Sequence, residues 1–504
     1  MIAPSSILYQ DPEATTFLID IPVSIARAQS LVQHRSSPPS FSTTSPSVPE
    51  HGRNRILLSA PPLREPYPAR TEPKTDAARA NVLERTPLSE RLFHSEILEP
   101  LVTKGLTRIR DVLESEFRWC LPRTEADPNA QEATCGVKLD DEAFIARKRK
   151  RTEQTGGERR ETVDATFELA NSDTAAPATP IDRRVSHDPP LILSPGVNSF
   201  SSMSEFCDLV VRNTSLQSAT IQVFCPIMMT DSARCRHSQH HRANPLHSFY
   251  IPPLSSFLQC KIPMSHPGAH SDPIPGLPRH ETFNLILLDP PWANRSVRRS
   301  GHYQTQTYRD WDLLTQRICQ ILSVHLVKDC SGVSAEGTDR KENGRAADAI
   351  AAIWITNSGK ARKTAYEAMQ VAGLAVCEEW VWVKTTTEGE PITPVGALWR
   401  KPYEILVIGK RAGCGPRETH SQSRARKAED GVVRRVIAAV PDIHSRKPNL
   451  REVFEQVFFS DGPVDEAGMR YRALEVFARN LTAGWWAVGD EALKFNSEEW
   501  WVES

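Results

Sequence analysis

From about residue 249 onward the sequence alternates between short apolar runs and amphipathic segments, and this alternation strongly constrains the fold. The runs FNLILLD (283–289) and AIAAIWIT (349–356) have the length and composition of buried strands. Residues 311–327 and 359–373 space their apolar side chains as helices do. Further strands are expected at 249–260, 377–384, 403–410, 473–479 and 485–491, and a further helix at 449–458. The pattern predicts an α/β fold with a largely parallel sheet covered on both faces.

The chain has 504 residues, which exceeds the usual length of one domain. Residues 1–30 contain two apolar runs and a short helical pattern, so we expect a small folded segment there. Segments 31–86 and 121–188 have too few large apolar side chains to offset the entropy of ordering the chain, so both are predicted to be disordered linkers. Residues 87–120 predict a pair of amphipathic helices separated at Pro100.

The main domain is expected to span residues 189–504, with a mobile insertion at 411–430. The formal net charge of -1 excludes a globally basic nucleic-acid-binding protein, so contacts with phosphate must come from local clusters. The run ARKRKR (146–151) fits a nuclear-import signal as well as a solvated charge run, and we expect a nuclear, otherwise cytoplasmic, protein. No CxxC pair and no long apolar run occur, as in a soluble protein of a reducing compartment.

A polar tract, CRHSQHHR (235–242), contains one cysteine and three histidines that are close enough to share an ion. Structural zinc sites usually draw their ligands from two separated pairs, and no second pair lies nearby in the sequence. We therefore predict a polar surface loop and no metal site.

The chemistry is concentrated where the apolar run LILL ends in DPPW. Asp289 falls at the carboxyl end of a buried strand, the edge at which α/β sheets bind ligands. Pro290 and Pro291 restrict the backbone to a rigid extended turn. Such a turn can hold the Asp289 carboxylate and the Pro290 carbonyl side by side, with Trp292 as a flat stacking surface.

Two acceptors beside an aromatic side chain suit a planar ring that carries an amino group, and an extruded adenine fits this description. Acceptors that hold both amino hydrogens draw the nitrogen toward tetrahedral geometry and aim its lone pair at an electrophilic methyl group. The alternative for an isolated DPPW is an ordinary strand-to-loop exit. The surrounding α/β pattern and the arginine-bearing loop that follows favour the catalytic hypothesis.

The sequence resembles the DPPW adenine N(6)-methyltransferases of the mRNA adenosine methyltransferase type, most closely the methyltransferase-like protein four branch and its fungal members. The blocks that carry the resemblance are LILLDPPWANRSVRRS, WRKPYEILVIGK, IHSRKPNL, EVFARNLTAGWWAVGDEALKF and, weakly, LIDIP. It covers residues 190–504 well and 6–28 weakly. It implies S-adenosylmethionine as cofactor and a Rossmann-like fold of permuted motif order.

The resemblance also implies roles for individual residues. The residues expected at the cofactor are Asp289, Lys447, Arg479, Asn480, Asp490 and Glu491. Arg479 and Asn480 match residues that bind the cofactor ribose. Asp490 departs from the Asn of relatives and loses the amide donor, which puts the role of this position in doubt. Trp485 and Trp486 are expected to pack in the core.

A second set of residues follows Trp292 and is expected at the substrate: Asn294, Arg295, Ser296, Arg298, Arg299 and Tyr303. Three arginines beside a base pocket suit the phosphates that flank an extruded base, although a solvated loop is the alternative. Tyr303 either caps the pocket or packs. Asn294 and Ser296 are placed near the target nucleotide by the resemblance alone.

Together these observations predict methyl transfer from S-adenosylmethionine to the 6-amino group of adenine in a polynucleotide, with RNA as the first substrate and DNA close behind. A cytosine N(4)-methyltransferase would typically carry Ser or Thr in place of Asp289. A catalytically inactive scaffold subunit usually lacks the acid or the tryptophan, and this chain has both. We expect no membrane contact, and a protein partner would bind through the N-terminal region.

Overall fold

The computed structural model describes most of the chain outside its long polar segments. The described residues are 5–31, 55–68, 72–113, 117–126, 189–224, 246–263, 272–292, 311–328, 349–411, 431–460, 464–465 and 468–503. All of them belong to one compact unit formed by residues 1–126 and 188–504. Several predictions fall outside the described residues: disorder at 32–54 and 127–188, the basic run 146–151, the tract 235–242, the insertion 412–430 and the six substrate residues at 294–303.

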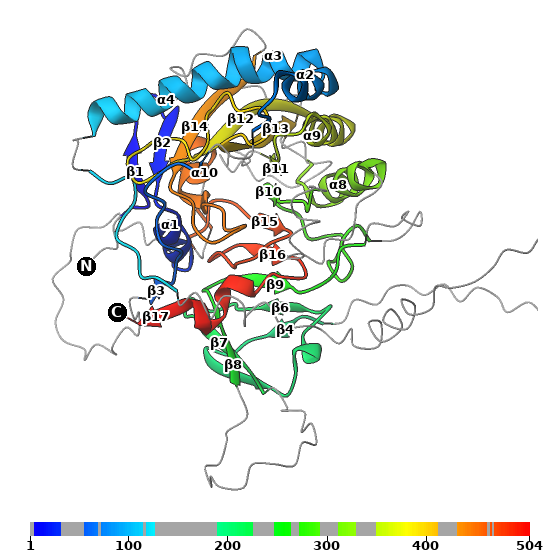
Figure 1. Ribbon diagram of the computed structural model, residues 1–504. Coiled ribbons are helices and arrows are strands. Elements are labelled where there is room, and N and C mark those ends of the chain that lie inside the picture. The colour runs from blue at the N-terminus through cyan, green and yellow to red at the C-terminus, as the bar shows by residue number, and fades with distance from the viewer. Residues whose placement is uncertain are drawn as a thin grey trace, which may run out of the picture. The chain divides into compact units, whose positions relative to one another are not determined.

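A twelve-stranded mixed sheet forms the centre of the described unit (Figure 1). Its strands are, in spatial order, β1 (Ile7–Gln10), β2 (Thr16–Ile19), β14 (Val433–Ala439), β12 (Leu374–Lys384), β13 (Tyr403–Arg411), β11 (Ile350–Ile355), β10 (Leu285–Leu288), β15 (Ala473–Val476), β16 (Trp486–Val488), β9 (Ser256–Leu258), β6 (Val210–Arg212) and β4 (Leu191–Ile192). From β11 through β9 all neighbours are parallel. The predicted α/β fold is confirmed.

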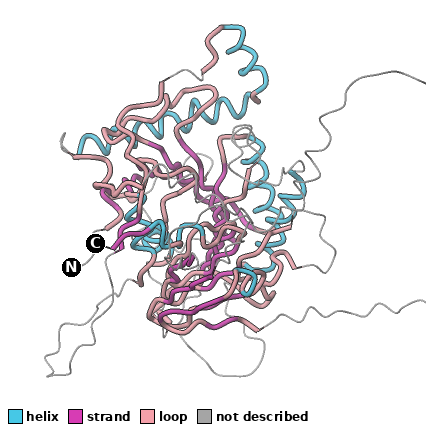
Figure 2. Tube along the Cα trace, turned by 60° about the horizontal axis from the view of Figure 1, so that its bottom comes forward, coloured by secondary structure: helices cyan, strands magenta, loops and turns pink. Residues whose placement is uncertain are grey.

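Helices cover both faces of this sheet, as Figure 2 shows. Alternate residues of β10 point to opposite faces, so Ile286 and Leu288 belong to one core cluster and Leu285 and Leu287 to the other. The first cluster includes apolar residues of α8 (Trp311–His325), α9 (Gly359–Val371) and α4 (Glu99–Val112). The second includes residues of α10 (Arg451–Phe458) and α1 (Ile21–Ala28). Burial on both faces explains why β10 reads as a continuous apolar run.

The N-terminal segment is part of the main sheet. Two strands and a helix form at residues 7–28, as predicted, and β2 pairs in parallel with β14. The hydroxyl of Ser6 donates to Glu452 on α10 at 2.6 Å, and Asp20 caps α1 by accepting from the N–H of Val23. The N-terminal segment, which was expected to be separate, therefore forms one edge of the central sheet.

The helical region between residues 76 and 112 differs from the pair of helices predicted at 87–120. It consists of α2 (Asp76–Arg85), α3 (Leu88–Leu92), a π-helical turn η2 (Phe93–Leu98) and α4. Pro100 does not separate two helices, because the helical run continues through it from α3 and η2 into α4, and the π-helical turn directly before it accommodates the missing N–H. The predicted disorder of residues 31–86 is wrong for α2 and for β3 (Arg55–Leu57), which pairs with β17 (Trp501–Glu503).

Two smaller differences concern the region before β10. The single strand predicted at 249–260 is two strands, β8 (Leu246–Ile251) and β9, because Pro252 and Pro253 interrupt it. β8 joins β7 (Ala219–Phe224) and β5 (Gly196–Phe200) in a separate three-stranded sheet. Among the described helices, none is long and apolar enough to cross a membrane.

Candidate active site

Asp289 lies at the carboxyl edge of the sheet, directly after β10. Its N–H donates to the carbonyl of Val476 at 3.2 Å, which continues the parallel pairing with β15 by one residue. Its side chain is 18% exposed. The flanking strands β11 and β15 are both parallel to β10, so the residues that follow all three strands meet at this edge. This is the position that ligands occupy in α/β sheets.

Two cationic side chains converge on the Asp289 carboxylate. Lys447 Nζ lies 3.3 Å from Oδ1, and a terminal guanidinium nitrogen of Arg479 lies 3.7 Å from Oδ2. Lys447 precedes α10, whereas Arg479 follows β15, so distant parts of the sequence meet here. Asn480 lines the same pocket as these three residues. The structure thus brings together four of the six residues that were predicted at the cofactor.

Lys447 is shared between two carboxylates. Its Nζ also donates to Glu404 on β13 at 2.9 Å, and Glu404 accepts a second hydrogen bond from Lys384 at 2.6 Å. Burial would raise the pKa of Glu404, but Lys384 and Lys447 hold it well below its ordinary value. Burial would likewise lower the pKa of Lys447, but Asp289 and Glu404 raise it above its ordinary value. Glu404 and Lys447 therefore both stay charged at neutral pH.

The last two predicted cofactor residues have different positions. Glu491 accepts from Arg479 Nε at 3.0 Å and from Lys494 at 2.8 Å, so it orients the guanidinium from the side away from Asp289. Asp490 is exposed, and neither it nor Glu491 lines the pocket. Glu491 therefore acts on the site through Arg479.

The fold brings to this site two acids that were not predicted from the sequence. Glu475 on β15 lines the pocket, and burial together with the Asp289 charge raises its pKa to about 8 against the opposing effect of Arg479. Its carboxyl group is therefore mostly protonated at neutral pH. Glu404 is the other missed acid. The available signal was a carboxylate inside an otherwise apolar strand run, in YEILVIGK and ALEVF.

Strained backbone borders the same pocket. Ser445 and Phe477 line it, and both have positive φ, +71° and +62°. Non-glycine residues adopt this region rarely, at a cost on the order of 1 kcal/mol or more, and such residues cluster at functional sites. Gly489 lies against this loop, where a Cβ would come within 3.2 Å of the Phe477 Cα. The loop that carries Arg479 is therefore held in one conformation by its surroundings.

Trp292 does not present the open face that was predicted. Its indole is 7% exposed, and it stacks on Trp311 at a centroid distance of 5.8 Å. Its Nε1 donates to the carbonyl of Trp354 at 2.7 Å, and its backbone N–H donates to the carbonyl of Pro290 at 2.8 Å. The apolar ring is thus buried in the core, and its one donor has a hydrogen-bond partner there. Trp292 fixes the turn that carries Asp289.

Part of the chain is similar in sequence to known proteins. Residues 342–491 match the MT-A70 family. This part of the chain is similar to MT-A70 domains. A 266-residue region, 52% of the chain, is 39% identical to N6-methyladenosine RNA methyltransferase MTA1 of Cryphonectria parasitica and covers 65% of that protein. This confirms the predicted family resemblance.

Two other relatives carry different descriptions. N(6)-adenine-specific methyltransferase METTL4 of Mus musculus is 30% identical over 260 residues, 50% of this chain and 45% of that protein. DNA N6-methyl methyltransferase of Caenorhabditis elegans is 28% identical over 254 residues, 50% of this chain and 54% of that protein. The match thus spans less than two thirds of each of these three relatives.

The MT-A70 match and the catalytic strand are adjacent in space although Asp289 precedes the matched residues. β10 lies between β11 and β15, which both belong to the matched range. The matched range supplies Lys447 and Arg479, and the preceding strand supplies Asp289. The family match and the DPPW motif are therefore two halves of one site.

Trp485 and Trp486 pack in the core, as predicted.

Proposed function

We propose that this chain transfers a methyl group from S-adenosylmethionine to the 6-amino group of adenine in a polynucleotide, with RNA as the first substrate and DNA the second. The observation that carries the proposal is the Asp289 carboxylate at the edge of parallel strands, paired with Lys447 and Arg479 of the range that matches the MT-A70 family. The descriptions of the relatives, which name adenine N6 methylation of RNA or DNA, support the same reaction.

The side chains around Asp289 offer the donors and acceptors that S-adenosylmethionine requires. Lys447 offers an ammonium group to the methionine carboxylate, whereas Arg479 and Asn480 offer donors to ribose hydroxyls. The pocket between them encloses about 40 Å³, which is too small for S-adenosylmethionine. The cofactor therefore enters as the ion pairs with Asp289 separate. When bound, the cofactor supplies an electrophilic methyl group on a positively charged sulfur. Lys447 then exchanges the Asp289 carboxylate for that of the cofactor, whereas Arg479 exchanges it for ribose hydroxyls.

The residues of this chain position the adenine amine. Once the two cations turn away, both Asp289 oxygens can accept from the amino group. The Pro290 carbonyl accepts one hydrogen bond from Trp292 and retains a second lone pair for the other amino hydrogen. Acceptors on both hydrogens hold the nitrogen lone pair toward the methyl donor. The surplus proton then leaves through an Asp289 oxygen.

The test is methyl transfer by the full chain. The protein is incubated with methyl-labelled S-adenosylmethionine and separate RNA and DNA pools, and nucleosides are identified by mass spectrometry. We expect label in N6-methyladenine, lowered on the order of 100-fold or more by Asp289→Ala and by Asp289→Asn, which keeps the size of the side chain but removes its charge. Label in cytosine, equal label with the Ala variant, or no label at all would refute the proposal.

A further inference from the structure

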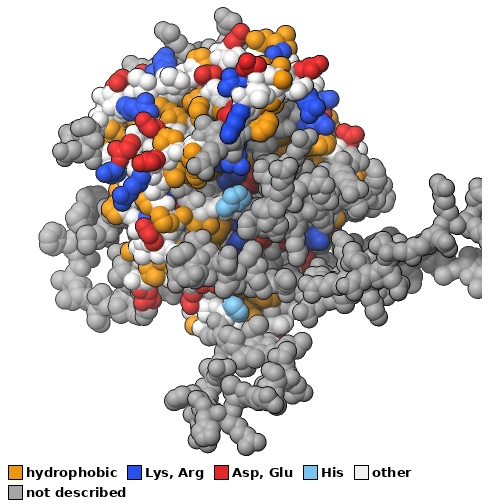
Figure 3. Space-filling model, viewed as in Figure 1, with side chains coloured by type: hydrophobic (Ala, Val, Ile, Leu, Met, Phe, Trp, Pro, Cys, Tyr) orange, Lys and Arg blue, Asp and Glu red, His pale blue; other side chains and the backbone are white. Residues whose placement is uncertain are grey.

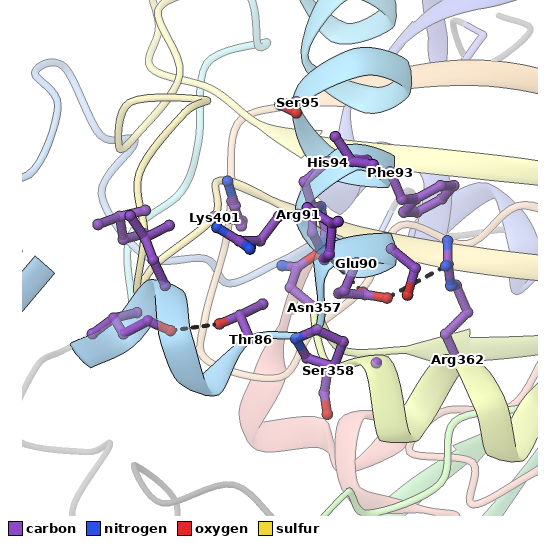
Figure 4. A pocket seen from close by; sticks show the side chains of 18 of the residues that line it. Thr86, Glu90, Arg91, Phe93, His94, Ser95, Asn357, Ser358, Arg362 and Lys401 are labelled. Atoms are coloured by element: carbon purple, nitrogen blue, oxygen red, sulfur yellow. Dashed lines mark hydrogen bonds and ion pairs between the residues drawn. The ribbon is translucent and has the colours of Figure 1, made fainter. Parts of the chain in front are cut away.

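A larger hollow lies beside the catalytic edge, between the N-terminal helices and the start of α9. It has a volume of about 1290 Å³ and is lined by residues between 82 and 99, between 357 and 366, and between 396 and 401, together with Arg434. We name it the helical groove. Figure 4 shows α3 and η2 on one side of it and the residues from Asn357 to Arg362 on the other. None of the residues predicted at the cofactor or at Asp289 lines it.

Basic side chains predominate in the helical groove. Its lining includes the cations Arg85, Arg91, Lys360, Arg362, Lys363, Lys401 and Arg434 and the acids Glu90 and Glu99. Carboxylates pair with three of these cations, in Arg362–Glu90, Lys363–Glu367 and Arg434–Glu379. An excess of positive charge remains, although the whole chain has a formal net charge of -1. On the coloured part of the face in Figure 3 the two signs are interspersed.

An exposed tryptophan lies among these cations. The side chain of Trp399 is 57% exposed, whereas its backbone is fixed, because the N–H groups of Leu398 and Trp399 donate to Glu72 at 2.8 and 3.1 Å. A large apolar ring held in solvent on an anchored backbone gains free energy when a flat partner covers it. Nucleobases are such partners, and stacking on aromatic side chains tolerates any base.

The helical groove adjoins the Asp289 pocket. Trp354 lines that pocket and Asn357 lines the groove, so the two are joined by three residues, at most about 11 Å of extended chain. On β13, the Tyr403 hydroxyl contacts His94 Nδ1 at 2.9 Å on the groove side, while the next residue, Glu404, holds Lys447. A strand whose adenine reaches Asp289 therefore has the groove within a few nucleotides.

We propose that the helical groove binds the single strand that flanks the target adenine, with Trp399 stacked on an unpaired base and Lys360 and Lys401 beside its phosphates. Its role in methylation rests on the proposed function, whereas strand binding is independent of it. A single strand fits better than a duplex because stacking on Trp399 requires an unpaired base. An acidic peptide satisfies the cations but leaves the indole uncovered.

Fluorescence anisotropy tests this with the full chain and a labelled single-stranded RNA of about twelve nucleotides, its DNA counterpart and the duplex. We expect Trp399→Ala to weaken single-strand binding by about 5- to 150-fold, and Trp399→Phe, which keeps a ring, to weaken it far less. Lys360→Glu should weaken binding and lower the slope of log affinity against log salt by about 0.7. Lys104→Glu, an exposed change on α4 outside the groove, is the control.

The outcomes separate this inference from the proposed function. A wild-type chain that binds the single strand but methylates no adenine refutes the function and leaves the groove assignment intact. Equal affinity for wild type, Trp399→Ala and Lys360→Glu overturns the groove assignment, whatever the methylation assay shows. Tighter binding of a labelled polyglutamate than of either oligonucleotide also overturns it. Thermal melting of each variant checks that it is folded.

Discussion

Asp289 is bound by two cations that are themselves held from behind, Lys447 by Glu404 and Arg479 by Glu491. Removing one partner of a half-buried ion pair usually leaves an uncompensated charge and costs several kcal/mol. Here each cation has a second acid, Glu404 or Glu491. Both cations therefore keep an anionic partner when their contacts with Asp289 break. The same arrangement lets a zwitterionic ligand take over the contacts one at a time.

Glu475 predicts an unusual pH dependence of stability. Its pKa rises from an ordinary 4.5 to about 8 in the folded chain, so the folded state binds a proton that the unfolded state has lost between these values. Its contribution to the free energy of unfolding therefore falls as pH rises from about 4.5 to 8. We expect Glu475→Gln, which cannot ionise, to melt at a higher temperature than wild type at pH 8 and to lose this advantage near pH 4.5.

Glu367→Gln provides the matched control, because Glu367 forms an exposed ion pair with Lys363 on α9. This variant should keep the difference in melting temperature between pH 5 and pH 8 that wild type shows. If the melting temperature of Glu475→Gln equals that of wild type from pH 4.5 to pH 8, the Glu475 carboxyl group is ionised in the folded chain at neutral pH.

Trp292 and Trp399 allow the same substitution to be compared in two settings. Trp292→Phe keeps an aromatic ring in the core but leaves the Trp354 carbonyl without its 2.7 Å donor, which costs about 1–2 kcal/mol. We expect a lower melting temperature and a lower kcat, because the turn that carries Asp289 loses an anchor. Trp399→Phe, at an exposed ring, should leave the melting temperature unchanged. Unchanged stability and kcat in Trp292→Phe would contradict the positioning role.

At the scale of elements, the packing of α4 on the sheet depends on Gly105. A Cβ at this position would lie 3.0 Å from three side-chain atoms of Val436 on β14. Overpacking of this kind costs about 1–3 kcal/mol, more than the roughly 1 kcal/mol that Ala gains over Gly in a helix. We therefore expect Gly105→Ala to lower the free energy of unfolding measured in urea.

The double-mutant cycle with Val436→Ala checks this cause. Truncation of Val436 removes the atoms that a Cβ at position 105 would meet, so Gly105→Ala in that background should be neutral or stabilising. An equal loss of stability in both backgrounds would mean that contact with Val436 is not the reason.

Elements whose signal is local could be predicted from the sequence. β10, β11 and α9 carry the apolar pattern of their own burial, so their positions followed directly. β3 and α2 could not be predicted in this way, because β3 depends on pairing with β17 and α2 buries no residue of its own. The predicted break at Pro100 was wrong because a π-helical turn just before a proline lets the helix continue through it.

The residues of the site also divide into those that a local sequence pattern predicts and those that it does not. The strand position and the rigid turn of Asp289 could be inferred from its own neighbours, whereas Lys447 and Arg479 came only from a family resemblance. Glu404 and Glu475 acquire their importance from partners on other strands, which no local pattern shows. The direction in which the Trp292 ring points is likewise decided by Trp311 and Trp354.

At the scale of the whole molecule, the segments expected to be separate form one unit with the range that matches the MT-A70 family. β2 extends the central sheet beyond β14, and the helices from α2 to α4 form one side of the helical groove. The N-terminal region thus has a structural place beside the active site. Its helices supply the lining cations Arg85 and Arg91, whereas the other lining cations belong to the matched range.

The order of strands also affects how this protein is made. β15 and β16 lie between β10 and β9, although the ribosome synthesises them nearly 200 residues after β10 (473 - 288 = 185). Until they emerge, the nascent chain holds two apolar strands with open edges, which are targets for chaperones and for aggregation. A transcript cut short before β15 would encode a sheet that lacks its middle, and the cell would be expected to degrade that product.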